Sequence, residues 1–416
     1  MPHILQPLIG YRPRWIEHAL AGRTSQGKVR LLFGARQTGK SWLFRRLTPP
    51  GTLRIDLQDG RERARYERDP GAFTSEILAR KERRLTIVVD EIQKVPALLE
   101  EVQLLVDRHP RRFEIFLTGS SARRLRAGSA NLLPGRAHTY RMFPIVSAER
   151  EGFERSEVLP LGVPPGPGPR FANEPIERRL VWGSLPGVVG EPAARATATL
   201  EAYAENYVEE EVRRESLVRD VGAFGRFLEI AAMESGRVMN LTGLSQESGV
   251  PVATLRTYYQ VLVDTFLGHW IGSYGPRGRK QLLTTPRFVF FDTGVRNAAA
   301  RLPLSRDLLK TQAGTLFEQW VLLELVHRAA YLGRSHRVSF WRTRHGAEVD
   351  AVVETPKIDV PIEVKWTESP RPADARHVEA FLDTYPTRAR AGLLVCRVRR
   401  PMRLTDRVTA IPWSDL

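Results

Sequence analysis

One stretch of eight residues restricts the fold of this chain more than any other feature. Residues 34–41 read Gly-Ala-Arg-Gln-Thr-Gly-Lys-Ser and satisfy the pattern G-x-x-x-x-G-K-[ST]. The apolar run 29–33 before it is of strand type, and residues 41–47 after it have helical spacing. A strand, a glycine-rich loop and a helix in this order place backbone N–H groups around phosphate oxygens at the positive end of the helix. The sequence therefore predicts a nucleotide-binding loop.

The last two residues of this pattern carry specific roles. Lys40 is expected to reach the β- and γ-phosphates, and the Ser41 hydroxyl is expected to ligate Mg²⁺. A glycine-rich surface turn is the alternative, and the flanking strand and helix argue against it. The residues expected to contact the nucleotide are Gly34, Ala35, Arg36, Gln37, Thr38, Gly39, Lys40 and Ser41.

A second apolar strand, residues 85–89, ends in two adjacent carboxylates, Asp90 and Glu91. This pattern is typical of a Walker B element. Asp90 would hold Mg²⁺ through water, and Glu91 would orient and polarise the attacking water. An acidic pair at a strand end is also common in turns and helix caps. Following a phosphate loop by about fifty residues, it favours hydrolysis of ATP with Mg²⁺.

A third strand is predicted over residues 113–119, with small hydroxyl residues near its end. Thr118 or Ser120 would lie where a γ-phosphate can be sensed, because open parallel α/β sheets build their sites at the carboxyl ends of strands. Arg136 follows in the segment Leu133-Pro134-Gly135-Arg136. It is a candidate arginine finger for a neighbouring subunit's γ-phosphate. A solvated or backbone-capping arginine is the alternative.

These motifs together resemble the AAA-type ATPases in which the ATPase domain is fused to a carboxy-terminal DUF4143 region. The segments that carry the resemblance are 34–40, 89–96, 117–121 and 133–136. Two residues depart from the usual pattern: Pro134 stands where alanine is usual, and Ser41 replaces threonine while keeping the hydroxyl. The resemblance implies a small helical lid over the nucleotide and a homo-oligomer, for which a six-subunit ring is one arrangement.

The expected fold is α/β, with a P-loop AAA-type core, a helical lid, a winged helix-turn-helix and a carboxy-terminal α/β domain of PD-(D/E)xK nuclease type. A proline- and glycine-rich run at 159–169 cannot sustain a helix or a central strand and indicates a seam. The expected domains are the AAA core at 1–150, linker and lid at 151–218, winged helix-turn-helix at 219–300 and nuclease-like domain at 301–416.

Residues 241–259 predict a helix, a glycine turn and a second helix, which is typical of a helix-turn-helix. Basic and aromatic residues on the second helix, and a basic segment after it, suit contacts with DNA phosphates or bases. A scaffold that binds only protein is the alternative. The expected DNA contacts are Arg256, Tyr258, Arg277, Arg279 and Lys280.

Asp350, Glu363 and Lys365 follow the spacing D-x12-E-x-K, which resembles the PD-(D/E)xK nuclease fold. Glu348-Val349-Asp350 is expected to end one strand and 361–365 to form the next, so that the side chains cluster around a divalent ion. Glu318 is expected to start a helix and to supply a further carboxylate. A DNA-binding or interaction module without cleavage is the alternative. Asp292 is expected to cap a helix.

Amino-acid composition restricts the kinds of partner that we expect for this chain. The formal charge of +16 favours a polyanion such as DNA. Of 63 basic residues 8 are lysines, leaving 55 arginines, a skew that a GC-rich genome would also produce. The single cysteine, Cys396, excludes a disulfide framework, and no stretch of about 18 apolar residues exists to cross a membrane. We expect a cytoplasmic protein.

Three functions fit these observations. The first is an oligomeric, ATP-hydrolysing DNA-binding protein that translocates on DNA or remodels a junction or fork. The second is a nucleotide-dependent switch whose accessory domains bind protein partners, in signalling or as an antitoxin. The third is a Mg²⁺-dependent DNA nuclease that ATP regulates.

Overall fold

A computed structural model describes residues 10–21, 28–121, 133–154, 158–162, 168–207, 220–275 and 285–416. The chain divides into two compact units. The first consists of Met1–Phe143, Pro165–Arg170 and Asp264–Phe266, and the second of Pro144–Pro164, Phe171–Val263 and Leu267–Leu416. We call them the amino-terminal and carboxy-terminal units and describe each by itself.

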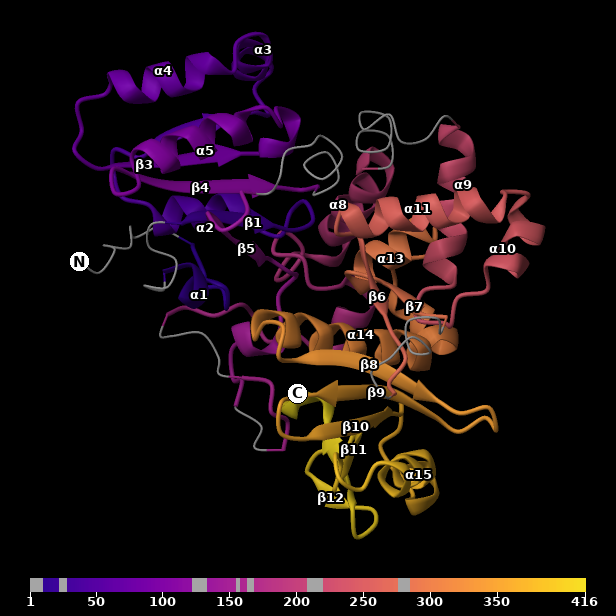
Figure 1. The fold of residues 1–416 in the computed structure, drawn as a ribbon. Coiled ribbons are helices and arrows are strands. Elements are labelled where there is room, and N and C mark those ends of the chain that lie inside the picture. The colour runs from indigo at the N-terminus through magenta and orange to yellow at the C-terminus, as the bar shows by residue number, and fades with distance from the viewer. Residues whose placement is uncertain are drawn as a thin grey trace. The chain divides into compact units, whose positions relative to one another are not determined.

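The amino-terminal unit is built on a five-stranded parallel sheet in the order β2-β3-β4-β1-β5. Figure 1 shows α3, α4 and α5 on one side of this sheet and α1 and α2 on the other. The strands are β1 Val29–Phe33, β2 Leu53–Asp56, β3 Leu85–Asp90, β4 Phe113–Gly119 and β5 Ala137–Arg141. The helices are α1 Glu17–Ala21, α2 Lys40–Leu47, α3 Gly60–Arg68, α4 Gly71–Ala79 and α5 Leu98–Arg108.

The central strands of this sheet are apolar because helices cover both faces. All five residues of β1 are buried, and its side chains join those of β3 and β4 in one core. The strands predicted from residues 29–33, 85–89 and 113–119 are thereby confirmed. Because the strands are parallel and adjacent, the segments that follow β1, β3 and β4 meet at one edge of the sheet.

The carboxy-terminal unit begins with helices and a two-stranded antiparallel ribbon. The helices before the ribbon are α7 Ile176–Trp182, α8 Ala193–Tyr207, α9 Val221–Met233, α10 Leu241–Ser248 and α11 Val252–Asp264. The ribbon consists of β6 Gly268–Ile271 and β7 Arg287–Phe290, and helix α13 Thr293–Ala299 follows it. The predicted helix, glycine turn and helix are confirmed as α10, Gly249 with φ 68°, and α11. Asp292 caps α13 as expected, because its Oδ1 accepts a hydrogen bond from the Val295 N–H at 3.0 Å.

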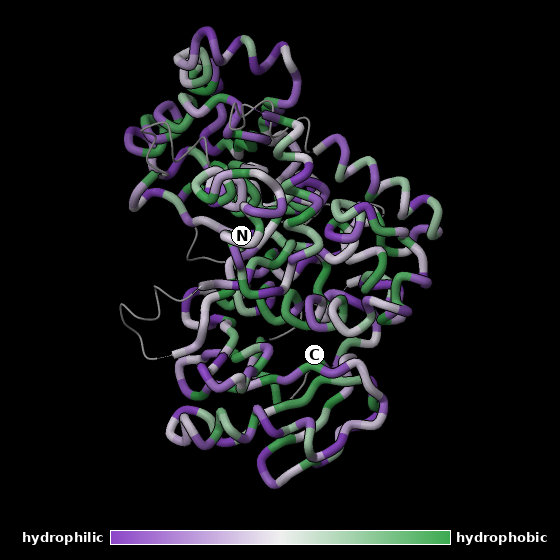
Figure 2. The backbone as a smooth tube through the Cα atoms, turned by 90° about the vertical axis from the view of Figure 1, so that its right-hand side faces the viewer, coloured by the Kyte–Doolittle hydropathy of each residue, from purple (hydrophilic) through white to green (hydrophobic). Residues whose placement is uncertain are grey.

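The unit ends in a six-stranded mixed sheet in the order β12-β13-β11-β10-β9-β8. Pairs β8·β9 and β9·β10 are antiparallel, whereas β10·β11 and β11·β13 are parallel. Figure 2 shows long hydrophobic stretches in these strands. The elements are α14 Leu309–Tyr331, β8 Arg337–Arg342, β9 Glu348–Glu354, β10 Asp359–Val364, α15 Arg376–Thr384, β11 Gly392–Cys396, β12 Met402–Arg403 and β13 Val408–Pro412.

Two expectations for this unit are wrong. Glu348-Val349-Asp350 begins β9 instead of ending a strand, because a turn closed by the Thr343 N–H and the Ala347 carbonyl at 2.8 Å lies just before it. Glu318 lies within α14 instead of starting a helix, because the helix begins nine residues earlier at Leu309. None of the described helices combines the length and the apolar character that crossing a bilayer requires.

Candidate active site

The glycine-rich loop between β1 and α2 has little room for side chains near its first residue. A Cβ on Gly34 would lie 2.4 Å from the Met142 carbonyl oxygen, so a larger residue would push the loop from the sheet. Gly39, with φ 96°, and Gln37, with φ 59°, adopt left-handed conformations. These two turns let the chain curl back on itself before α2 begins at Lys40.

The loop curls around the Lys40 side chain. The lysine is buried, with 6% of its surface exposed. Its Nζ donates hydrogen bonds to the carbonyl oxygens of Gly34 at 2.8 Å and Ala35 at 2.9 Å. Its ammonium group therefore sits inside the turn that the glycine pattern predicted for phosphates.

Ser41 and Asp90 meet directly, although they are far apart in sequence. The Ser41 Oγ donates a hydrogen bond to the Asp90 Oδ2 at 2.7 Å, and the Thr118 hydroxyl donates to the other carboxylate oxygen. Strand β4, which carries Thr118, lies between β1 and β3 and brings this hydroxyl beside the carboxylate. The serine and aspartate predicted to hold Mg²⁺ are thus neighbours, and Thr118 is buried between the strands.

Glu91 stands in a strained backbone position, with φ 58° and ψ 49°. Its Oε2 accepts a hydrogen bond from the Ser120 hydroxyl at 2.6 Å and a second from the Gln93 side chain. Burial by itself raises the pKa of Glu91, but the nearby Lys40 ammonium and the two hydrogen bonds outweigh it, so the pKa lies below its ordinary value. Glu91 is therefore an oriented carboxylate at neutral pH.

Lys40, Ser41 and Glu91 border a cleft of about 300 Å³. Three cations and one carboxylate line it, which suits a polyphosphate. Within the described residues no three His, Cys, Asp or Glu side chains are placed to hold a metal ion. Mg²⁺ usually takes one or two protein ligands with water and phosphate oxygens, so Ser41 and Asp90 fit it. The lining residues are Arg36, Gln37, Gly39, Lys40, Ser41, Trp42, Gln58, Glu91 and Lys94.

Sequence reasoning missed two residues that hold this site together. Gln93 donates hydrogen bonds to both Glu91 and Ser120, the latter at 3.1 Å. Arg14, 3% exposed, donates to the carbonyl oxygens of Thr38 and Phe143, both at 2.7 Å. Gln93 lies within the motif at 89–96, which offered a signal, whereas nothing near Arg14 indicates its role.

Models of protein families match three segments of the chain. An AAA domain matches residues 26–150, and two domains of unknown function match later segments: DUF8612 at 173–306 and DUF4143 at 313–416. The chain joins an AAA domain to a carboxy-terminal DUF4143 domain. The amino-terminal parallel sheet thus resembles a P-loop ATPase core. The four domain boundaries expected from the sequence stay a prediction.

Two curated relatives are themselves uncharacterized proteins, Mb2031c of Mycobacterium bovis and Rv2008c of Mycobacterium tuberculosis. Each is 24% identical over 400 residues, covering 93% of this chain and 80% of the relative. Among solved structures, the Walker-type ATPase PABY2304 of Pyrococcus abyssi is similar at 16% identity, with a TM-score of 0.45, over 72% of this chain and 99% of that one.

Arg136 of the AAA domain does not lie in this cleft. Its carbonyl oxygen accepts a hydrogen bond from the Val29 N–H at 2.9 Å, which places it at the start of β1. The loop follows the other end of β1, about 15 Å away for a five-residue strand. The Arg136 guanidinium pairs with Asp107 on α5, and this hydrogen bond raises its pKa. A role at its own domain's nucleotide is excluded, and a role at a neighbour's stays a prediction.

The DUF4143 segment brings the four residues of the second predicted site together. Asp350, at the start of β9, accepts a hydrogen bond from the Val364 N–H at 2.8 Å because β9 and β10 are antiparallel. The Lys365 Nζ lies 2.9 Å from the Glu363 Oε1. Glu318 of α14 is held by Arg287, whose Nη1 donates to its Oε1 at 3.0 Å.

Burial and mutual repulsion perturb these carboxyl groups. Burial, with a further contribution from Asp350, raises the pKa of Glu363 to about 8 and that of Glu318 to about 7. Burial likewise raises the pKa of Asp350. Glu363 is 4% exposed, and its Oε2 is buried without a hydrogen-bond partner in the described part of the chain. This oxygen is available to a cation or to a proton.

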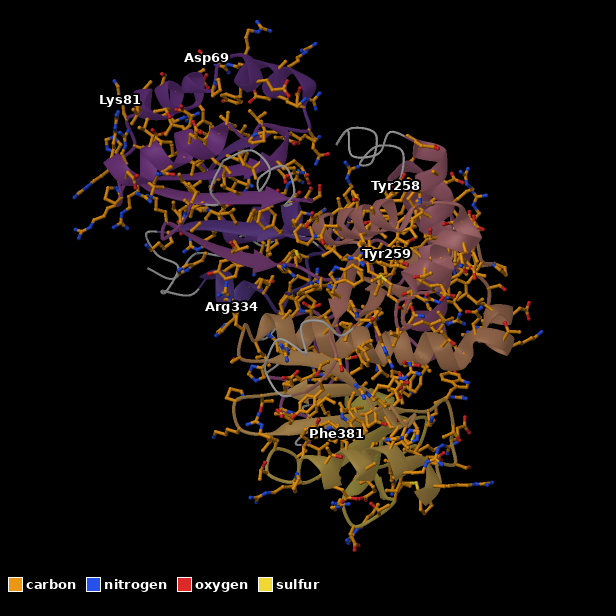
Figure 3. The ribbon with its side chains drawn as sticks, turned by 45° about the vertical axis from the view of Figure 1, so that its right-hand side comes forward. Asp69, Lys81, Tyr258, Tyr259, Arg334 and Phe381 are labelled. Carbon is orange, nitrogen blue, oxygen red and sulfur yellow. The ribbon has the colours of Figure 1, made fainter. Side chains whose placement is uncertain are left out.

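The helix-turn-helix contradicts one expected DNA contact. Tyr258 is 5% exposed and packs against Phe224 and Phe227 of α9, with ring centroids 5.0 and 5.2 Å apart, so it belongs to the core. Figure 3 labels Tyr258 and its buried neighbour Tyr259 among these helices. Arg256 is exposed on the same helix, as expected. The remaining expected contacts, Arg277, Arg279 and Lys280, lie outside the described residues.

Proposed function

We propose that the AAA domain hydrolyses ATP with Mg²⁺ and that hydrolysis drives an oligomer that remodels or moves along DNA. The observation that supports hydrolysis is the continuous set of contacts from Ser41 through Asp90 and Thr118 to Glu91. It joins the phosphate loop to an ionised carboxylate held in a fixed orientation. A site that only bound nucleotide would not need that carboxylate.

Each residue has a distinct task in this proposal. Lys40 and the loop N–H groups hold the terminal phosphates. Ser41 and Asp90 hold Mg²⁺, which neutralises charge on the phosphate oxygens when bound. Glu91 accepts a hydrogen bond from the attacking water and orients it, while Ser120 and Gln93 keep its carboxylate in position.

The DNA part of the proposal is supported by the formal charge of +16 and by exposed Arg256 on α11. The test measures phosphate release from ATP by the whole chain with and without a forked DNA at about 50 mM salt. We expect hydrolysis that Lys40→Ala abolishes and that DNA stimulates. Absence of hydrolysis contradicts the ATPase proposal, whereas hydrolysis indifferent to DNA, with no DNA binding, favours a nucleotide switch.

A second candidate function is Mg²⁺-dependent DNA cleavage by the DUF4143 domain. The observation that favours it is the buried, unpartnered Oε2 of Glu363 beside Asp350 and Lys365. Two carboxylates suffice for Mg²⁺ when water and phosphate complete its shell. Cleavage of plasmid DNA that is lost in Asp350→Asn and in Lys365→Ala but survives Lys40→Ala would establish this activity. Intact plasmid with all four proteins would exclude it.

A further inference from the structure

A second cleft in the AAA domain, of about 830 Å³, is strongly basic. It lies between the segment that joins α4 to β3 and the turn that precedes β4. One carboxylate, Glu82, accompanies six cations in its lining. These cations are Arg80, Lys81, Arg83, Arg84, Arg111 and Arg112.

The two segments are fixed side by side by the sheet. Leu85, the first residue of β3, pairs with Phe113, the first residue of β4, and its N–H donates to the Arg112 carbonyl oxygen at 3.0 Å. The Arg112 side chain reaches back to the carbonyl oxygens of Arg80 and Glu82, the latter at 3.3 Å. Arg112 is thus a positioning residue that ties one basic segment to the other.

Four of the cations are not neutralised by the protein. Lys81, Arg83, Arg84 and Arg111 are exposed and make no hydrogen bond or ion pair with any residue that the structure describes. Glu82 lies 3.8 Å from Arg80, which leaves no carboxylate of the cleft for the others. Figure 3 shows Lys81 at the outer margin of this unit. Like charges held this close repel one another, and a polyanion would relieve that repulsion.

We propose that this basic cleft binds the phosphate backbone of DNA. The proposal rests on the function proposed above and names the surface that would contact DNA. Arginine predominates, and its planar guanidinium forms paired hydrogen bonds with phosphate oxygens. Contacts with phosphate oxygens carry no sequence information, so we expect this binding to be independent of sequence. The apolar residues of the lining are Leu78 and Ala79, which provide few of the apolar contacts that an acidic peptide would also need.

The cleft and the nucleotide site lie at opposite ends of the same strand. Strand β3 begins at Leu85 beside the cleft and ends at Asp90 beside the phosphate loop, about 17 Å apart for six extended residues. Substitutions in the cleft therefore leave the hydrolytic residues untouched. Basal hydrolysis serves as the check that each variant is folded.

The test compares two triple variants of the whole chain. Arg83→Ala/Arg84→Ala/Arg111→Ala removes three free cations of the cleft. The control, Arg344→Ala/Arg399→Ala/Arg400→Ala, removes three exposed arginines of the carboxy-terminal unit and so has the same net charge. Binding to a fluorescein-labelled 20-base-pair duplex of random sequence is measured by anisotropy between about 50 and 200 mM salt.

For the cleft variant we expect affinity at least about tenfold lower than that of the parent, and a salt slope smaller by about 2 to 3, since each lost phosphate contact removes about 0.9. The control should stay within about threefold of the parent. Equal loss in both variants would show that net charge alone acts, and would overturn the proposal.

Three further results separate this proposal from the proposed function. DNA binding by the parent that the cleft variant retains places the DNA elsewhere and overturns only the cleft. No DNA binding by the parent, together with intact hydrolysis, overturns the cleft and the DNA part of the function. If the parent binds fluorescein-labelled poly-glutamate but not DNA, and the cleft variant loses this binding, the partner of the cleft is an acidic protein. This result also overturns the proposal.

Discussion

At the scale of single residues, Glu91 carries the strongest prediction. Its left-handed backbone aims the carboxylate at Ser120 and Gln93, and its lowered pKa keeps it ionised at neutral pH. Glu91→Gln keeps the shape but loses the charge, so we expect ATP to bind and phosphate release to fall about 10² to 10⁴-fold. Equilibrium binding of a labelled ATP analogue and a phosphate-release assay measure the two effects. Glu67→Gln, an exposed carboxylate of α3, is the control.

The buried carboxyl of Glu363 predicts a dependence of stability on pH. Its pKa of about 8 in the folded protein exceeds the value of about 4.3 in an unfolded chain. A raised pKa contributes stability below pH 4.3 that is lost as the pH rises towards 8. Glu363→Gln removes this titration, so relative to the parent it should gain about 2 to 4 kcal/mol between pH 5 and pH 8.

Urea unfolding of both proteins at the two pH values measures this gain. Exposed Glu247→Gln is the matched control and should show the same pH dependence as the parent. If the free energy of unfolding changed equally with pH in the parent and in Glu363→Gln, the Glu363 carboxyl would already be ionised at neutral pH in the folded state.

At the scale of elements, α11 presents two faces with different roles. Tyr258 packs on α9, whereas Arg256 is exposed. Tyr258→Ala should therefore lower the free energy of unfolding by about 3 kcal/mol, because it leaves a cavity among aromatic rings. Arg256→Ala should change it by less than about 0.5 kcal/mol. Chemical denaturation checks both, and a stable Tyr258→Ala protein would contradict the packing.

Local patterns were sufficient to predict the elements that build the nucleotide site. Strand β1 is an apolar run followed by the glycine-rich loop, β3 and β4 are apolar runs that end in polar residues, and parallel neighbours bring these segments to one edge. Side-chain contacts from distant segments were not predictable. The contact of Gln93 with Ser120, and those of Arg14 with Thr38 and Phe143, depend on positions that only the folded sheet defines.

The errors in the carboxy-terminal unit have the same origin. Tyrosine suits both a core and a DNA surface, so the sequence did not decide which face of α11 carries Tyr258. The start of β9 depends on a turn between Thr343 and Ala347, in which Gly346 adopts a φ of 85°, and this single glycine was not sufficient to predict the turn. Asp350 and Glu363 nevertheless meet, because the antiparallel pairing sets the start of β9 against the end of β10.

At the scale of the whole molecule, the position of Arg136 determines how many subunits make one active site. It lies at the start of β1 and β5, at the edge opposite to its own phosphate loop. If it neutralises charge at a neighbour's nucleotide, Arg136→Ala should slow hydrolysis about 10³-fold or more without weakening ATP binding in its own domain. A head-to-tail contact between copies is then required.

Mixing inactive variants tests this arrangement. Arg136→Ala subunits keep an intact Glu91, and Glu91→Gln subunits keep an intact Arg136. A shared site is complete where an Arg136→Ala subunit supplies Glu91 and the adjacent Glu91→Gln subunit supplies Arg136. In an equal mixture about one interface in four has this arrangement, so the mixture should recover about one quarter of the parent's rate. A mixture of Lys40→Ala and Glu91→Gln is the control and should stay inactive, because every one of its nucleotide clefts carries a defect. Recovery absent from the first mixture would show that Arg136 does not act across subunits, and its pairing with Asp107 would then be structural.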